Sequence, residues 1–208
     1  MIDHATLVTY ILIVLGFVFI PGPATLLTIA RAASSGTKVG IATGAGIAAG
    51  DLIHTSMAIA GLSAIIATSA LLFSIVKYAG AAFLIYLGIR AMLDKAPIEL
   101  NSAAPAIGAG RAFRQAVLTE VLNPKTALFF LAFLPQFVRP EHGSIGLQLA
   151  ILGIVFVLLG LVSTVVFAVG AGRLGNLLRR HPSVVKWQGK VVGTIYCAVG
   201  MRLALQER

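Results

Sequence analysis

An apolar run in the second half of the chain is interrupted by Leu122-Asn123-Pro124-Lys125-Thr126-Ala127. In a bilayer core a lysine is costly, and a proline frees a backbone carbonyl that lipid cannot satisfy. Such an interruption is expected to be buried against protein or to line a wet cavity. Pro21-Gly22-Pro23-Ala24 breaks the first apolar run in a similar way. Two broken segments at corresponding points of two halves are typical of the midplane binding site of a transporter.

The composition predicts an integral membrane protein. Of the 208 residues, 58% are hydrophobic and only 11% are charged, and the mean hydropathy is +0.96. Soluble domains carry roughly 25% charged residues. A net charge of +9 in so apolar a chain reflects loops rich in Lys and Arg rather than a nucleic-acid partner. The single cysteine, Cys197, excludes an intramolecular disulfide.

Six stretches approach the roughly 20 apolar residues that a membrane-spanning helix needs. The first begins without the basic segment of a signal peptide and is too long for one, so it is expected to remain as a helix. The sequence predicts one transmembrane domain over 1–208, with a first repeat at about 1–93, a linker at about 94–110 and a second repeat at about 111–208. The stretches lie at about 6–30, 39–67, 71–93, 112–138, 145–172 and 187–205.

The two halves of the chain share short sequence matches. Val76-Lys77-Tyr78-Ala79-Gly80 matches Val185-Lys186-Trp187-Gln188-Gly189, and Gly88-Ile89-Arg90 matches Gly200-Met201-Arg202. Weak similarity of this kind is typical of an internal repeat. Because each half has three spans, the second half must enter the membrane from the opposite side, which predicts an all-α fold of two inverted three-helix repeats.

Basic residues near the ends of the spans predict the orientation. Ten Lys and Arg residues lie on the side of the first, third and fifth connections and four on the other, with Lys125 and Lys190 left out as intramembrane. These connections include the turn at 31–38, the linker at 94–110 and a basic loop predicted from Arg173 to Lys186. By the positive-inside rule the linker faces the cytoplasm and both termini face outward. A re-entrant first segment would reverse the N-terminus.

The two breaks are the first candidate binding elements. Pro21, Gly22 and Pro23 remove helix donors and let the backbone turn, so that free backbone groups face a ligand. Asn123 and Pro124 repeat this arrangement, and the Lys125 ammonium suits a substrate carboxylate. The alternatives are a kink used only for packing and a lysine that extends to the cytoplasmic interface.

Intramembrane acids are the second set of candidates. Asp51 lies near the middle of the second predicted span, and His54 shares its helix face. A carboxylate beside a histidine is a candidate proton-coupling pair. The alternative for Asp51 is a structural ion pair with Lys125. Glu120 is a third candidate, or else an exposed interfacial acid.

Spaced glycines follow the first break. Gly36, Gly40 and Gly44, then Gly46 and Gly50, have the small-xxx-small spacing that lets membrane helices approach closely. Packing within the chain is the favoured interpretation, and the same spacing makes a homodimer a candidate assembly.

Several motifs of enzymes are missing from the sequence. It contains no phosphate-binding loop of the Walker type, no His-Glu-x-x-His, no Cys/His cluster and no Gly-x-Ser-x-Gly. We therefore predict a protein that is not an enzyme and needs no cofactor or metal.

The two Pro-containing motifs together resemble those of the LysE/RhtB family of bacterial amino-acid exporters, over nearly the whole chain. The resemblance rests on Pro21-Gly22-Pro23-Ala24, Gly50-Asp51-Leu52, Leu122-Asn123-Pro124-Lys125-Thr126-Ala127-Leu128-Phe129-Phe130 and Phe133-Leu134-Pro135-Gln136-Phe137. It implies a multi-pass protein of the bacterial inner membrane that exports amino acids or close derivatives by proton antiport. Substrates in the family include basic amino acids, threonine, homoserine and its lactone, and leucine. The matching site residues are Pro21, Gly22, Pro23, Asp51, Asn123, Pro124 and Lys125.

The sequence thus predicts an exporter with alternating access, whose partners are an amino acid, protons and membrane lipid. The candidate substrate- or ion-binding residues are Pro21, Gly22, Pro23, Asp51, His54, Glu120, Asn123, Pro124 and Lys125. Two other classes stay open: an intramembrane enzyme acting on a lipid or a small hydrophobic metabolite, and a membrane assembly partner without flux.

Overall fold

A computed structural model describes residues 2–19, 22–68, 70–93 and 105–180, together with 187, 190, 193–194, 197–198, 200–201 and 204–205. All regular structure in these residues is helical. The long helices are α1 (His4–Phe19), α2 (Pro23–Ser35), α3 (Thr37–Thr68), α4 (Ala70–Leu93), α5 (Ala109–Val121) and α7 (Ile145–Arg180). Short helical elements join α5 to α7, namely α6 (Pro124–Leu128), η1 (Phe129–Phe133), η2 (Leu134–Phe137) and η3 (Pro140–His142).

Two helices are each long and apolar enough to cross a membrane, over Thr37–Ile65 of α3 and Ile145–Ala171 of α7. Two bent pairs have the composition of one further span each. The first pair, α1 with α2, bends by 51°, and the second, α5 with the segment from Pro124 to Phe137, bends by 45°. The described residues therefore hold two to four candidate spans, and the sixth predicted stretch is described only at separate positions.

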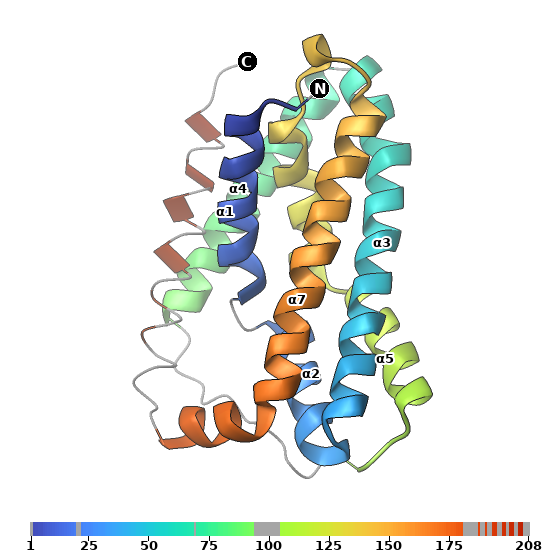
Figure 1. The fold of residues 1–208 in the computed structure, drawn as a ribbon. Helices are drawn as coiled ribbons and strands as arrows, with labels where there is room; N and C mark the ends of the chain where they lie inside the picture. Colours follow the sequence, from blue (N-terminus) through green and yellow to red (C-terminus); the bar gives the residue numbers. More distant parts are fainter. Residues whose placement is uncertain are drawn as a thin grey trace.

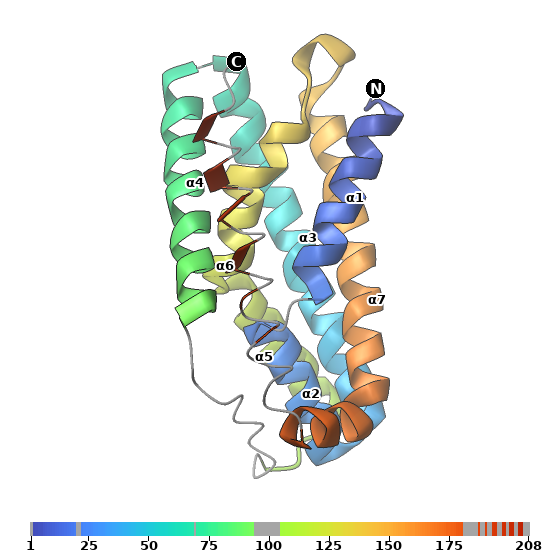
Figure 2. The same cartoon turned by 90° about the vertical axis from the view of Figure 1, so that its left-hand side faces the viewer.

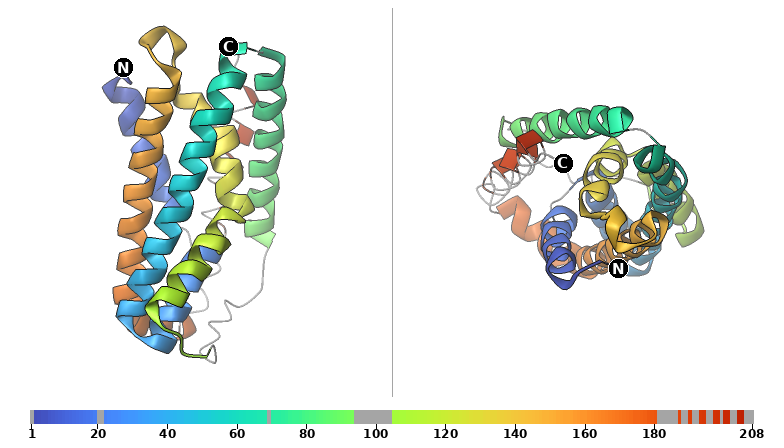
Figure 3. Two further views of the ribbon diagram at one scale, coloured as in Figure 1. Left: turned by 90° about the vertical axis from the view of Figure 1, so that its right-hand side faces the viewer. Right: turned by 90° about the horizontal axis from the view of Figure 1, so that it is seen from above.

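The helices form an elongated bundle around α3. This helix packs against α5, α7 and α2, while α1 packs on α7 and α4 on η1. Figure 1 and Figure 2 show the N-terminus and the turn before α7 at one end, and the turn between α2 and α3 at the other. Seen along the bundle in Figure 3, α4 lies at the periphery.

At four of the five spaced glycines, neighbouring helices approach as closely as the spacing predicted. A Cβ atom at Gly40 would lie 3.0 Å from Ala168 Cβ, and one at Gly44 would lie 2.6 Å from Thr164 Oγ1, both on α7. On the other side of α3, Gly46 and Gly50 face α5. These surfaces are used inside the chain, so the spacing no longer argues for a homodimer.

Two expectations are corrected. Gly36 does not pack against a helix: it ends α2 with a φ of +90°, which favours glycine, and nothing lies within 4 Å of its Cβ position. The predicted basic loop from Arg173 is helical as far as Arg180, because α7 spans 36 residues. The basic residues in this segment indicate where the chain leaves the apolar layer of the membrane. They do not end the helix, because Leu and Arg are good helix formers.

Aromatic side chains fill the interior next to the N-terminal end of the bundle. Phe129 lies at the centre, with ring centroids 4.5 Å from Phe17, 4.9 Å from Phe133 and 4.8 Å from Phe156. Tyr10 packs edge-on against Phe137, and its hydroxyl donates to the carbonyl of Leu152 at 3.0 Å. We call this set the aromatic cluster: Tyr10, Phe17, Phe129, Phe130, Phe133, Phe137 and Phe156.

Candidate functional site

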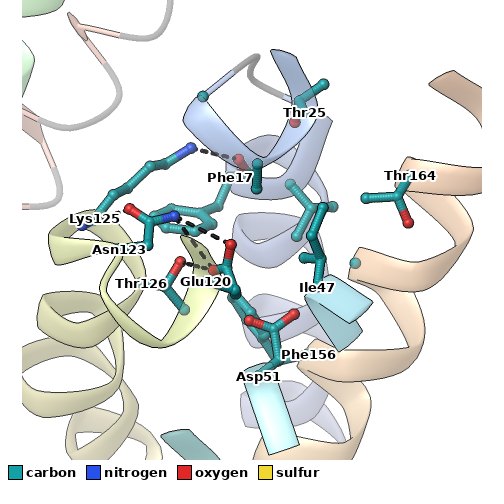
Figure 4. Close-up of a pocket in the computed structure, with 14 residues that line it drawn as sticks. Phe17, Thr25, Ile47, Asp51, Glu120, Asn123, Lys125, Thr126, Phe156 and Thr164 are labelled. Atoms are coloured by element: carbon teal, nitrogen blue, oxygen red, sulfur yellow. Dashed lines mark hydrogen bonds between the residues drawn. The ribbon is translucent and has the colours of Figure 1, made fainter. Parts of the chain in front are cut away.

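A cavity lies where the two helix breaks meet, against α3 and α7. It encloses about 420 Å³ of empty space, a volume that includes space open to solvent. Figure 4 shows polar side chains from α2, α3, α5, α6 and α7 around it. The lining residues are Phe17, Val18, Gly22, Ala24, Thr25, Ile47, Asp51, Glu120, Asn123, Lys125, Thr126, Phe156, Gly160 and Thr164.

The break between α1 and α2 leaves the last carbonyls of α1 without partners in the helix. Side chains from distant segments satisfy two of them: Ser163 Oγ donates to Val18 O at 2.8 Å, and Lys125 Nζ donates to Phe17 O at 3.3 Å. The start of α2 has Gly22 as its N-cap and no side-chain cap. Gly22, Ala24 and Thr25 line the cavity, so the start of α2, which is the positive end of its dipole, forms part of the cavity wall.

Lys125 lies against this first break. Its Nζ is 4.2 Å from the centroid of the Phe17 ring, a cation–π contact. A Cβ atom at Gly22 would lie 3.3 Å from the same nitrogen. A side chain at Gly22 would therefore contact the end of the Lys125 side chain and require it to move by a few tenths of an ångström.

The break between α5 and α6 is organised by Asn123. Its Oδ1 accepts a hydrogen bond from the Lys125 amide at 3.1 Å and so caps α6. Its Nδ2 donates to both carboxylate oxygens of Glu120 at 3.3 Å, and Thr126 Oγ1 donates to Oε1 of the same carboxylate. Glu120 is only 2% exposed, so the alternative of an interfacial acid is wrong.

His54 lies behind the cavity rather than in it. Its Nε2 is 3.0 Å from the carbonyl of Glu120, to which it donates, and its ring stacks on Phe130. The imidazole thus satisfies a carbonyl at the end of α5. His54 follows Asp51 by one turn, but its described hydrogen bond is with the chain around Glu120.

Asp51 is a buried acid with an oxygen that lacks a hydrogen-bond partner among the described residues. It is 2% exposed, and its Oδ1 accepts no hydrogen bond from any residue that the structure describes. Its carboxyl group lies beside that of Glu120, close enough to form a hydrogen bond when one of the two is protonated (Figure 4). An unsatisfied buried acceptor is costly, so this carboxyl group is suited to receive a proton or a cationic ligand.

The structure brings together five of the predicted site residues, Gly22, Asp51, Glu120, Asn123 and Lys125. The two prolines that begin α2 and α6 do not line the cavity. Pro23 and Pro124 are the first residues of α2 and α6, where the missing amide costs nothing, and both are exposed rather than part of the cavity wall. Pro21 lies outside the described residues.

One face of α7 completes the cavity and was not predicted. Phe156, Gly160 and Thr164 follow each other at intervals of four, so they share a helix face. The sequence shows this spacing, but the residues around it are almost all apolar, so no polar face distinguished these three positions. Thr25 and Thr126 are the other polar lining residues that were missed, although they follow closely after the two breaks.

Comparisons with known proteins identify the family of the chain. A family model for LysE type translocators matches residues 15–207. The chain is 32% identical over 184 residues to a homoserine/homoserine lactone efflux protein of Salmonella typhimurium, with 88% of each chain covered. It is 31% identical over 197 residues to an uncharacterized membrane protein of Vibrio cholerae, with 94% of each covered.

A third relative is the membrane protein YrhP of Bacillus subtilis, 33% identical over 209 residues, with 96% of this chain and 99% of the relative covered. No solved structure matches the chain. Because the family model covers nearly the whole sequence, including both helix breaks and the cavity they form, the chain belongs to the LysE type translocator family.

Proposed function

We propose that this protein exports small amino acids with uncharged side chains, or their close derivatives, across the bacterial inner membrane. The observation that carries the proposal is the pair of opposite charges at the cavity between the two breaks. The Asp51 carboxyl, with an unsatisfied oxygen, comes from α3, and the Lys125 ammonium comes from α6. An α-amino acid carries an ammonium and a carboxylate on one carbon, so it complements both groups.

The substrate carboxylate is expected at Lys125 and at the uncapped start of α2. The ammonium provides charge-assisted hydrogen bonds, and Gly22, Ala24 and Thr25 place the first turn of α2 in the same wall. A helix N-terminus favours an anion. The substrate ammonium then lies at the Asp51 carboxyl group, which lines the cavity.

The charge of the lining supports an uncharged side chain. Asp51 and Lys125 serve the two α-groups in this arrangement, and the Glu120 carboxylate is already held by Asn123 and Thr126. No further charged residue lines the cavity in the described part of the chain. Threonine, homoserine and leucine, which carry both α-groups and no further charge, therefore fit better than basic amino acids. The Salmonella typhimurium relative, a homoserine/homoserine lactone efflux protein, supports this class.

Proton antiport is supported by the two adjacent carboxyl groups. Carboxylates in contact cannot both ionise readily, so a proton is held at the pair until a cation replaces it. We propose that the substrate ammonium and a proton alternate at Asp51, with Glu120 as the neighbouring acid. His54, which was predicted to pair with Asp51, has a positioning role in this scheme because it holds the end of α5.

Alternating access requires the cavity to be closed on one side at a time. Phe17 and Phe156 of the aromatic cluster line the cavity, and the cluster continues along α1 to Tyr10, toward the N-terminus, which supports a state closed on that side. In the proposed inverted repeat, the similar bends of 51° and 45° mark corresponding helices of the two halves. The charge asymmetry of the connections supports a cytoplasmic linker and external termini.

Efflux from proteoliposomes tests the proposal. Vesicles are loaded with labelled threonine, homoserine, leucine or lysine, and release is measured with and without an imposed pH gradient. We expect gradient-dependent release of the neutral amino acids. Asp51→Asn should lower the gradient-dependent rate at least tenfold and Lys125→Met should raise the KM.

Matched controls are Asp3→Asn and Lys38→Met, which change the same residue types at exposed positions. Equal activity in Asp51→Asn and Asp3→Asn would place the coupling site elsewhere. Absence of release for every amino acid, from folded wild-type protein, would overturn the proposal. Conversion of an added lipid or metabolite would then favour the enzyme, and no flux or conversion would favour the assembly partner.

A further inference from the structure

Gly160 is a glycine that helix packing does not require. At Gly44, Gly50 and Gly153 an added Cβ atom would collide with Thr164, Glu120 and Thr55, respectively, so packing explains those glycines. At Gly160 the Cβ position has one neighbouring atom within 4 Å, Asp51 Oδ2 at 3.4 Å, which is an ordinary van der Waals distance. Alanine is also the better helix former at such a position.

The Cβ position of Gly160 points into the cavity, beside the acid that the proposed function assigns to the substrate ammonium. Gly16, Gly61 and Gly146 also have room for a methyl group, but none of them lines the cavity. An ammonium bound to a carboxylate stands about 2.7–2.9 Å from its oxygen. The group attached to that ammonium must therefore pass through the space next to Asp51 Oδ2.

We propose that Gly160 is a specificity-determining residue: its missing side chain leaves a methyl-sized space beside Asp51 that admits the α-carbon and side chain of the substrate. The inference rests on the proposed function, because it takes Asp51 as the ammonium site. The bulk of the substrate is then limited by α7, and Ile47 and Thr164 form the adjoining wall of the same space.

Gly160→Ala tests this without disturbing the packing of α7. The matched control is Gly146→Ala, on the same helix, where the new Cβ would lie 3.6 Å from Ser63 Oγ and away from the cavity. Both variants should unfold at or slightly above the wild-type temperature in detergent. KM and kcat are then measured for neutral amino acids from glycine and alanine to threonine and leucine.

We expect the KM of Gly160→Ala to rise with side-chain size, at least tenfold for the largest amino acid that the wild type exports and much less for the smallest. Gly160→Val should extend the loss to smaller substrates, while Gly146→Ala stays at wild-type values throughout. An equal change across the panel, or a Gly160→Ala profile identical to that of Gly146→Ala, would overturn the inference. Failure of the wild type to export any amino acid would instead refute the proposed function.

Discussion

Asn123 provides a sharp test of how the second break is held together. Its amide oxygen caps α6 through the Lys125 amide, and its amide nitrogen donates two long hydrogen bonds of 3.3 Å to Glu120. Asn123→Ala removes all three. Asn123→Ser retains an oxygen for the cap but is too short to hold the carboxylate as well, so the two variants separate the cap from the Glu120 contact.

The expected loss follows from the bonds removed. The N-cap hydrogen bond contributes about 1 kcal/mol. The two long hydrogen bonds from Nδ2 to the Glu120 carboxylate are counted together as one hydrogen bond to a charged group, about 1.5 kcal/mol at the lower end of its range. Asn123→Ala should therefore cost about 2.5 kcal/mol, and serine should recover about 1 kcal/mol. For a chain of this size each kcal/mol lowers Tm by about 2–4 °C, which gives about 5–10 °C for alanine.

Thermal unfolding of the purified protein in detergent, followed by circular dichroism, measures both losses. Efflux of a neutral amino acid at the same temperature reports on Glu120, whose carboxylate is released in both variants. We expect the order wild type, serine, alanine in Tm and a similar loss of coupled efflux in the two variants. Unfolding of Asn123→Ala at the wild-type temperature would refute the account of the break, and equal Tm values for serine and alanine would refute the cap.

Two further substitutions test the packing around the cavity. Gly50→Ala places a Cβ atom 2.6 Å from Glu120 Cβ and should cost about 1–3 kcal/mol by overpacking; Gly61→Ala on the same helix, with nothing within 4 Å, should cost nothing, and equal unfolding temperatures would contradict this contact. Phe129→Ala empties the centre of the aromatic cluster and should cost about 3–5 kcal/mol, with faster leak of substrate through the N-terminal side; the half-exposed Leu131→Ala is the control, and an unchanged leak rate would show that the cluster is not the barrier.

The sequence predicted the elements that depend on local chemistry. The long apolar runs match the described helices, because the apolar length needed to cross a bilayer can be read residue by residue. The breaks were predicted because proline lacks an amide donor wherever it stands. Asp51, Glu120, Asn123 and Lys125 were predicted as candidate site residues because polar groups in an apolar run have few other uses, and Gly22 was predicted because it stands in a helix break; all five line the cavity.

The sequence could not assign faces to the helices. The middle of α7 is apolar all around apart from Ser163 and Thr164, so the sequence did not indicate that Phe156, Gly160 and Thr164 face the cavity. The glycines of α3 had one spacing but two partners, since Gly44 contacts α7 and Gly50 contacts α5. Which partner a small residue meets depends on how neighbouring helices cross.

The partners of the polar groups were likewise decided by the tertiary structure. From the sequence, His54 was expected to pair with Asp51 one turn away, but its hydrogen bond is to the carbonyl of Glu120. Lys125 donates to the end of α1, more than a hundred positions earlier in the chain. The sequence by itself therefore determined where the chain spans, breaks and carries charge, whereas only the packing decided which broken end each side chain satisfies, because a freed backbone group is bonded by whichever donor the fold brings to it.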